Sequence, residues 1–224
     1  MLMLIKGEFF MLEEMLKVIS ERYSLTEKDT GEFSKIDLGQ AVFNVRCYYA
    51  EGLGHVSTMQ VSGMMNMDTI VINPFEKDMA LFSYDRMKFM GKDTLMLELY
   101  DTLINKDQTK IIDSLTPILN AYNDIADIPA KDDWCNSQLI KASVTKSVTE
   151  DSSSRFDELE IKYLSAILDL MEQADSCDEE TKKEVAGKYS SGLLEHGGAS
   201  TNNFLKVKGK EFTEKFFKEV FFGC

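Results

Sequence analysis

A carboxylate in an apolar strand is the residue best suited to chemistry in this sequence. Asp85 lies midway along an expected strand at residues 80–89, where Leu81 and Phe89 share its face at even spacing. Burying a carboxylate costs free energy unless the group is paired, hydrated or used. A carboxyl in an apolar pocket has a raised pKa and can act as a general acid at neutral pH. The alternative is a solvated face with Tyr84 buried instead, and the strand pattern leaves both interpretations open.

A β-hairpin must position this carboxylate. The strand at residues 80–89 carries Ser83 and Met87 on the same face as Asp85. The expected turn is at residues 91–93, and the return strand at residues 94–100 places three leucines on one side. The sequence therefore predicts two adjacent antiparallel strands with Asp85 near their middle.

Further strands precede this hairpin. Alternating or β-branched segments predict strands at residues 36–51, 55–64 and 68–73, with Pro74 ending the last of them. An amphipathic helix is expected at residues 3–23, and a loop at 24–34. Because at least five strands follow one another through short connections, we expect antiparallel pairing.

Helical patterns dominate after residue 103. Helices are expected at residues 106–125, 155–174, 178–194 and 209–222, and Pro117 predicts a kink or a break at Thr116. Residues 134–148 fit either a helix or a strand. Strands first and helices later, with one helix in front, predict an α+β fold whose antiparallel sheet has helices on both faces. We expect one domain over residues 1–224, since no linker is long enough to isolate a second core.

Composition excludes several classes of function. The chain has 25 Lys and Arg against 38 Asp and Glu, a formal charge of −13, which argues against a nucleic-acid-binding protein. Its four cysteines have no zinc-site or disulfide-framework spacing, and two histidines cannot form a His-rich metal site. Because no apolar run is long enough for a membrane span and no signal peptide is evident, we expect a cytoplasmic protein, or one in an organelle stroma-like compartment.

Several stretches, in order along the chain, resemble the ferredoxin-dependent bilin reductases, a family related to red chlorophyll catabolite reductase. The resemblance spans about residues 42–222, and Val220, Phe221 and Phe222 stand where that family has a closing "VLF"-like tripeptide. Each motif is weak alone, and their shared order gives the resemblance its weight. The stretches are RCYYAE (46–51), DTIVINP (68–74), LFSYDRM (81–87), MLELYDTL (96–103) and FLKVKGKEFTEKFFKEVFFG (204–223), together with Trp134 after a Pro-containing loop.

The resemblance implies a three-layer α/β/α sandwich that holds a linear tetrapyrrole (a bilin such as biliverdin) between the sheet and the C-terminal helices. It also implies reduction through substrate radicals, with single electrons from reduced ferredoxin or flavodoxin, protons from acidic side chains, and no bound cofactor or metal. Asp85 falls where the family has its central acid, so it is the expected general acid. The candidate bilin-binding residues are Thr69, Ser83, Met87, Thr201 and Asn203.

The sequence also departs from the family pattern. Thr69 stands where some members carry a histidine, and neither residues 54–67 nor residues 196–207 contain an Asp or Glu where other members carry further acids. His196 is the nearest titratable replacement for the missing C-terminal acid, and its alternative role is that of a solvated helix-end residue. The departures leave regiospecificity and activity open.

Three classes of function therefore remain. The first is a bilin reductase, the second is a non-catalytic tetrapyrrole-binding or carrier protein on the same fold, and the third is an interaction protein that docks a partner through its Phe-rich C-terminal helix. Five lysines between Lys206 and Lys218 could dock an acidic electron donor, or could simply form a mixed, solvated helix face.

Overall fold

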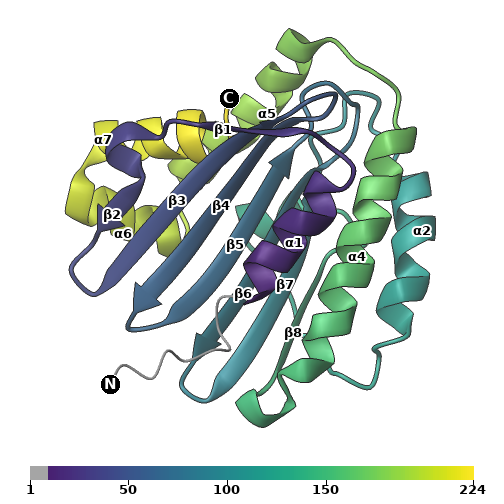
Figure 1. The fold of residues 1–224 in the computed structure, drawn as a ribbon, viewed down its shortest axis with the longest axis horizontal. Helices are drawn as coiled ribbons and strands as arrows, with labels where there is room; N and C mark the ends of the chain where they lie inside the picture. The colour runs from purple at the N-terminus through teal and green to yellow at the C-terminus, as the bar shows by residue number, and fades with distance from the viewer. Residues whose placement is uncertain (1–9) are drawn as a thin grey trace.

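An antiparallel sheet with two distinct faces forms the middle layer of the protein. The computed structural model describes residues 10–224 (Figure 1). Consecutive strands from β3 to β8 are neighbours, and β1 and β2 pair with opposite ends of the outer edge of β3. The strands are β1 (Leu25–Lys28), β2 (Lys35–Asp37), β3 (Ala41–Ala50), β4 (Gly54–Gly63), β5 (Asn66–Asn73), β6 (Leu81–Phe89), β7 (Lys92–Tyr100) and β8 (Val144–Thr149).

The hairpin between β6 and β7 closes through two residues. Phe89 pairs with Lys92, and between them Met90 and Gly91 both have positive φ angles, 51° and 76°. Two consecutive positive φ angles match the twist of a two-residue hairpin turn, and glycine takes up this conformation without strain. The turn predicted at residues 91–93 is therefore displaced, because Lys92 and Asp93 already belong to β7.

Helices cover both faces of the sheet. On one face α1 and α4 lie against the strands and α2 packs outside α4, while α5, α6, α7 and the π-helical turn η3 cover the other face (Figure 1). Short elements are η1 (Gly31–Phe33), α3 (Trp134–Ser137) and η2 (Glu150–Ser152). The remaining helices are α1 (Phe10–Ser20), α2 (Thr109–Asn120), α4 (Ser154–Gln173), α5 (Glu179–His196), α6 (Ala199–Lys208), α7 (Lys210–Lys215) and η3 (Phe216–Phe221).

Each face of the sheet has its own apolar core. On the α4 side, Phe82 and Tyr84 of β6 are fully buried with Tyr163. On the α5–α7 side, Phe43 of β3 packs against Phe204 of α6. The Phe204 ring stacks on Phe216 of η3, with ring centroids 4.9 Å apart. Because burying one large apolar side chain stabilises a fold by roughly 1.5–3 kcal/mol, both cores contribute substantially.

The predicted α+β class and the three-layer α/β/α arrangement are confirmed. The strands expected at residues 55–64, 68–73 and 80–89 and the helices expected at 155–174 and 178–194 are all present, with small changes in their ends. Of the helix expected at residues 3–23, residues 3–9 lie outside the described part, residues 10–20 form α1, and residues 21–23 form a turn after it. Within the described part of the chain, no helix is both long and apolar enough to cross a bilayer.

Several expected boundaries are wrong. The loop expected at residues 24–34 contains β1 and η1, and the strand expected at 36–51 is divided into β2 and β3. Of the kink or break predicted at Thr116, the break is absent, since α2 continues through Pro117 to Asn120. Residues 134–148 contain both alternatives, the helix α3 and the start of the strand β8. The helix expected at 209–222 is α7 followed by π-helical η3, and α6 before it was not expected.

Candidate functional site

Strand β6 directs Tyr84 and Asp85 to opposite faces of the sheet. Tyr84 is fully buried in the α4-side core, where its hydroxyl donates to Glu160 Oε2 at 2.8 Å. Asp85 faces the α5–α7 side, where it is partly buried, and β5 places Thr69 directly opposite it. Each sequence-based alternative is thus correct in one respect: Tyr84 is buried, and Asp85 is not freely solvated.

Two hydroxyl groups hold the Asp85 carboxylate. Thr69 Oγ1 donates to Oδ1 at 2.5 Å, and Ser83 Oγ donates to Oδ2 at 3.2 Å. Burial raises the pKa of Asp85, while these two hydrogen bonds favour the ionised form and offset part of that rise. Asp85 therefore keeps its proton to a higher pH than an exposed aspartate, as a general acid requires.

A second carboxyl group, Glu98, lies on the same face. The register pairs Ser83 of β6 with Glu98 of β7 and Asp85 with Met96, so Glu98 belongs to the next residue pair on the same face of the hairpin. The Tyr100 hydroxyl donates to Glu98 Oε2 at 2.5 Å. Burial raises the pKa of Glu98 to about 7, with a further contribution from the negative charge of Asp85.

Sequence reasoning missed Glu98 although a signal was present. The three leucines of β7 were assigned to one side of the strand, which places Met96, Glu98 and Tyr100 on the other. Combined with a hairpin register, this alternation would have brought Glu98 next to Asp85. The displaced turn shows that this register could not be fixed from sequence.

The α5–α7 side of the sheet is covered unevenly. Over β3–β5 and the start of β6 the C-terminal helices bury the strands, whereas from Asp85 onward the side chains of β6, and those of β7 and β8 on the same side, remain partly exposed. We call this partly exposed strip the open face. Its residues are Asp85, Met87, Thr94, Met96, Glu98, Thr145 and Ser147. The open face combines two carboxyl groups with thioether and hydroxyl side chains, a mixture that suits a flat ligand with both apolar and polar parts.

An aromatic row leads from the open face to the protein surface. Tyr100 packs against Tyr189 of α5 with ring centroids 4.4 Å apart, and the Trp134 ring stacks between Tyr189 at 6.0 Å and His196 at 4.9 Å. Gly192 lets the indole ring approach, because a Cβ there would lie 2.2 Å from a Trp134 ring atom. Trp134 and His196 also line a surface hollow of about 560 Å³ beside α5.

The structure brings together only some of the predicted site residues. Thr69, Ser83 and Asp85 are hydrogen-bonded, and Met87 follows on the same face. The other three belong to the α5–α6 region, and no hydrogen bond or ring contact among the described residues joins them to Asp85. His196 is exposed and stacks on Trp134, Thr201 is buried with its hydroxyl donating to the Gly198 carbonyl, and Asn203 is exposed.

Polar side chains of the sheet hold the end of the second helical layer. His55 Nε2 and Ser57 Oγ lie 2.9 and 2.7 Å from the carbonyl oxygens of Val220 and Phe221, respectively. In the same row, Asn73 Nδ2 donates to the Phe222 carbonyl at 2.8 Å. We call His55, Ser57 and Asn73 the carbonyl clasp. Burial lowers the pKa of His55 to about 4, so the clasp histidine is neutral at pH 7.

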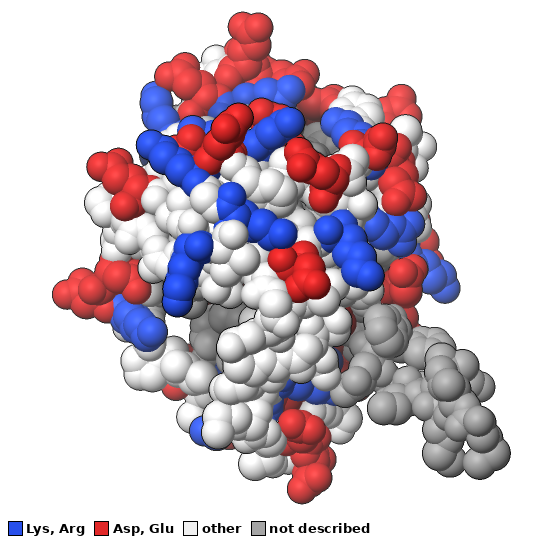
Figure 2. All heavy atoms as spheres, turned by 90° about the vertical axis from the view of Figure 1, so that its left-hand side faces the viewer, with Lys and Arg blue, Asp and Glu red and all other residues white. Residues whose placement is uncertain are grey.

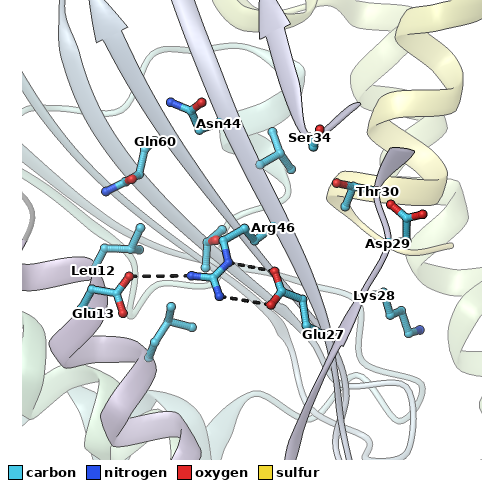
Figure 3. Close-up of a pocket in the computed structure, with 13 residues that line it drawn as sticks. Leu12, Glu13, Glu27, Lys28, Asp29, Thr30, Ser34, Asn44, Arg46 and Gln60 are labelled. Atoms are coloured by element: carbon cyan, nitrogen blue, oxygen red, sulfur yellow. Dashed lines mark hydrogen bonds and ion pairs between the residues drawn. The ribbon is translucent and has the colours of Figure 1, made fainter. Parts of the chain in front are cut away.

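The opposite face of the sheet has hollows of a different character. One of about 380 Å³ lies between α1, β1 and β3 (Figure 3). Figure 3 shows Arg46 at its centre between Glu13 of α1 and Glu27 of β1, with nitrogen–oxygen distances of 3.8 and 2.9 Å. Because two carboxylates already neutralise this guanidinium, the hollow is poorly suited to an anionic ligand. The raised-pKa carboxyl groups of the open face make that face the stronger candidate site.

The fold of this chain is shared with a protein of known structure. No protein-family model matches the sequence, and no curated protein matches it. The fold is similar to the crystal structure of phytochromobilin synthase from tomato in complex with biliverdin, with a TM-score of 0.76 and 13% sequence identity. The similarity covers 95% of this chain and 81% of the tomato chain. At this level of identity the comparison establishes a shared fold.

Proposed function

We propose that this protein reduces an open-chain tetrapyrrole bound on the open face, with Asp85 as a general acid. The observation that carries the proposal is the Asp85 carboxyl, whose pKa is raised by burial on a partly exposed strip of sheet. The structural similarity to a synthase crystallised with biliverdin supports a bilin as the ligand. The resemblance in sequence order, from the LFSYD strand to the C-terminal stretch, supports the same assignment.

The proposed chemistry needs electrons from outside the protein. Asp85 protonates a pyrrole carbonyl of the bound bilin, which makes the conjugated system easier to reduce. Reduced ferredoxin or flavodoxin then supplies electrons one at a time, and no bound cofactor is required. Thr69 and Ser83 hold the carboxyl in place, and Met87 provides an adaptable apolar contact.

The α6–α7 side of the molecule is the proposed docking surface for the electron donor. Lys206, Lys208, Lys210 and Lys215 are exposed there, although Lys210 is partly neutralised by Glu214 at 3.7 Å. Figure 2 shows Lys and Arg side chains across the middle of this side of the molecule, interspersed with Asp and Glu. Local positive charge would favour encounter with an acidic donor despite the formal charge of −13.

The first test separates binding from reduction. Purified protein is mixed with biliverdin, and the visible spectrum is recorded before and after addition of reduced ferredoxin. We expect a change on mixing and a further bleaching or blue shift on reduction. In Asp85→Asn, which keeps shape but removes the transferable proton, reduction should slow by roughly 10²-fold or more while affinity changes little. Normal turnover by Asp85→Asn would contradict the assignment of the acid.

A non-catalytic bilin-binding protein is the second candidate. The absence of any Asp or Glu from residues 196–207, where the resembled family often has an acid, favours it. A spectral change on mixing with biliverdin that reduced ferredoxin does not alter would support this candidate. No change at either step would contradict both and favour an interaction protein.

A further inference from the structure

The proposed reduction has a proton requirement that one carboxyl group does not meet. Reducing one double bond adds two electrons and two protons. Two reduced ferredoxins each give one electron and become oxidised, while two new bonds to hydrogen each take one proton. After Asp85 has given its proton it is a carboxylate and cannot give another until it is reprotonated. A second acid on the open face would supply the second proton within the same binding event.

We infer that Glu98 is the second proton donor of this site, an inference that rests on the proposed function. Its strand position carries the argument. Glu98 lies opposite Ser83, and Asp85 lies opposite Met96, so the two acids are diagonal neighbours across β6 and β7. Diagonal cross-strand neighbours on one face are roughly 7–8 Å apart, which lets both reach one planar ligand lying across the strands.

The environment of Glu98 suits a proton donor that is held in a fixed orientation and can be reprotonated from solvent. One carboxyl oxygen accepts the Tyr100 hydroxyl at 2.5 Å, and the Tyr100 ring packs on Tyr189 at 4.4 Å, which fixes the orientation of the group. The other carboxyl oxygen accepts no hydrogen bond from the described residues, so it is available to carry and transfer a proton. Because Glu98 is partly exposed, water can reprotonate it after each reduction.

The groups around Glu98 together set its pKa near neutral pH. Asp85 of β6 and Asp133, which caps α3, are negative neighbours and oppose its ionisation, as does burial. Cys135 of α3 and Tyr189 of α5 also lie within electrostatic range of Glu98. The Tyr100 hydroxyl acts in the opposite direction by stabilising the carboxylate. The balance raises the pKa of Glu98 to about 7, close to the value at which a general acid works best at neutral pH.

The variant Glu98→Gln tests this role because its amide can still accept the Tyr100 hydrogen bond but cannot release a proton. Biliverdin affinity is measured by absorbance titration, and reduction by anaerobic assay with reduced ferredoxin across a pH range. We expect little change in affinity and a reduction rate roughly 10²-fold lower at pH 7. The wild-type rate should fall as the pH rises past about 7, because Glu98 then loses its proton, and this decline should be missing in Glu98→Gln.

Two further variants separate proton donation from a structural role. Tyr100→Phe removes the hydroxyl that favours the carboxylate, so it should move the alkaline decline to higher pH without abolishing reduction. Glu160 is the matched control, since it is a buried carboxyl bonded by a tyrosine with its pKa raised to about 7, but on the α4 side. Glu160→Gln should lower the melting temperature yet leave reduction per folded molecule unchanged. If it does not fold, Tyr84→Phe, which removes only the hydrogen bond to Glu160, replaces it.

The outcomes distinguish this inference from the proposed function. If wild-type protein neither binds nor reduces biliverdin, the proposed function fails and the role of Glu98 fails with it. If the wild type reduces biliverdin and Glu98→Gln does so at the same rate with the same pH profile, only the inference about Glu98 is overturned. An equal loss of rate in Glu98→Gln and in the folded control would also overturn it.

Discussion

The burial of Asp85 favours its protonated form, which is useful for acid catalysis, but it makes the ionised form unfavourable for folding. Burial raises its pKa, which means that the ionised form is less stable in the folded protein than in the unfolded chain. Thr69 and Ser83 recover part of this free energy through hydrogen bonds to the carboxylate. Residues with such conflicts are concentrated at functional sites, where activity and stability are opposed.

This conflict predicts that Asp85→Asn stabilises the protein. A group whose pKa is raised by folding stabilises the folded state below its unfolded pKa and loses that contribution as the pH rises through its folded pKa. At pH 7 the variant avoids the buried charge, so its melting temperature should exceed that of the wild type. Below about pH 4, the pKa of an unfolded aspartate, Asp85 is protonated in both states and the difference should vanish.

Thermal unfolding followed by circular dichroism at several pH values checks this prediction. Asp113→Asn on α2 is the control, because it removes the same charge from an exposed position. The control should show no comparable gain. If the increase in melting temperature of Asp85→Asn stayed the same from pH 7 to pH 3.5, the increase would come from a change in packing and not from the ionisation of Asp85.

At the residue scale, sequence predicted one acid and missed the other. Asp85 could be recognised because alternation in β6 places it among Leu81 and Phe89. Glu98 looked like an ordinary exposed residue of an amphipathic strand, and its burial depends on contacts distant in sequence. Tyr189 of α5 packs on Tyr100, which in turn donates to Glu98, and alternation along one strand cannot indicate such a contact.

At the element scale, the contact between α3 and α5 depends on a glycine of α5, Gly192, which has no side chain to keep the indole ring away. The Trp134 ring lies directly over Gly192, and the same ring stacks on Tyr189 and His196. These three residues of α5 recur at helical spacing, so together they present one strip to the indole. The strip connects the surface of α5 to the aromatic contacts that orient Glu98.

A methyl group at position 192 should therefore displace Trp134. Gly192→Ala should destabilise the protein by about 1–3 kcal/mol, because the added Cβ would overlap the indole ring. Trp134 is the only tryptophan of the chain, so its fluorescence reports the displacement directly and should shift to longer wavelength.

Gly187→Ala is the matched control on the same helix, since a Cβ there meets no atom within 4 Å. It should be neutral or stabilise α5 by up to about 1 kcal/mol. Equal stabilities of the two variants would show that the indole contact is not tight.

Sequence predicted elements well where local pattern and packing agree. The apolar stripe of α4, the β-branched run of β5 and the alternation in β6 each identify the correct element. β1 was missed because Leu25 is the only apolar residue of this short edge strand, which is held by pairing with β3. α2 continues through Pro117 although proline disfavours a helix, because Ile111 and Leu115 are buried in the core that α2 shares with α4. Tertiary contacts decided both cases.

At the scale of the whole molecule, charge distribution determines whether an acidic donor can approach. Lys206 and Lys208 lie in the last turn of α6 and are both exposed. If this surface docks ferredoxin, the double variant Lys206→Glu and Lys208→Glu should raise the apparent KM for ferredoxin by about 5- to 10-fold and leave bilin affinity unchanged. Lys110→Glu, an exposed reversal on α2, is the control and should have no such effect.

Salt dependence gives a second measurement of the same surface. Raising the ionic strength to about 0.15 M, where the screening length is near 8 Å, should weaken donor binding by the wild type more than by the double variant. Equal salt dependence of the two proteins would place the donor site elsewhere on the molecule.

The carbonyl clasp also constrains the order in which the protein is completed during synthesis. Its three side chains belong to β4 and β5, whereas the carbonyls of Val220, Phe221 and Phe222 that they bind come after all the described strands in the chain and therefore leave the ribosome later than the sheet does. The sheet from β3 to β7 can form earlier by successive hairpins, and α4 can then cover its first face. Until the helices from α5 to η3 are made, the nascent chain presents the apolar second face of β3–β5 uncovered, a surface of the kind that chaperones bind and that aggregates readily.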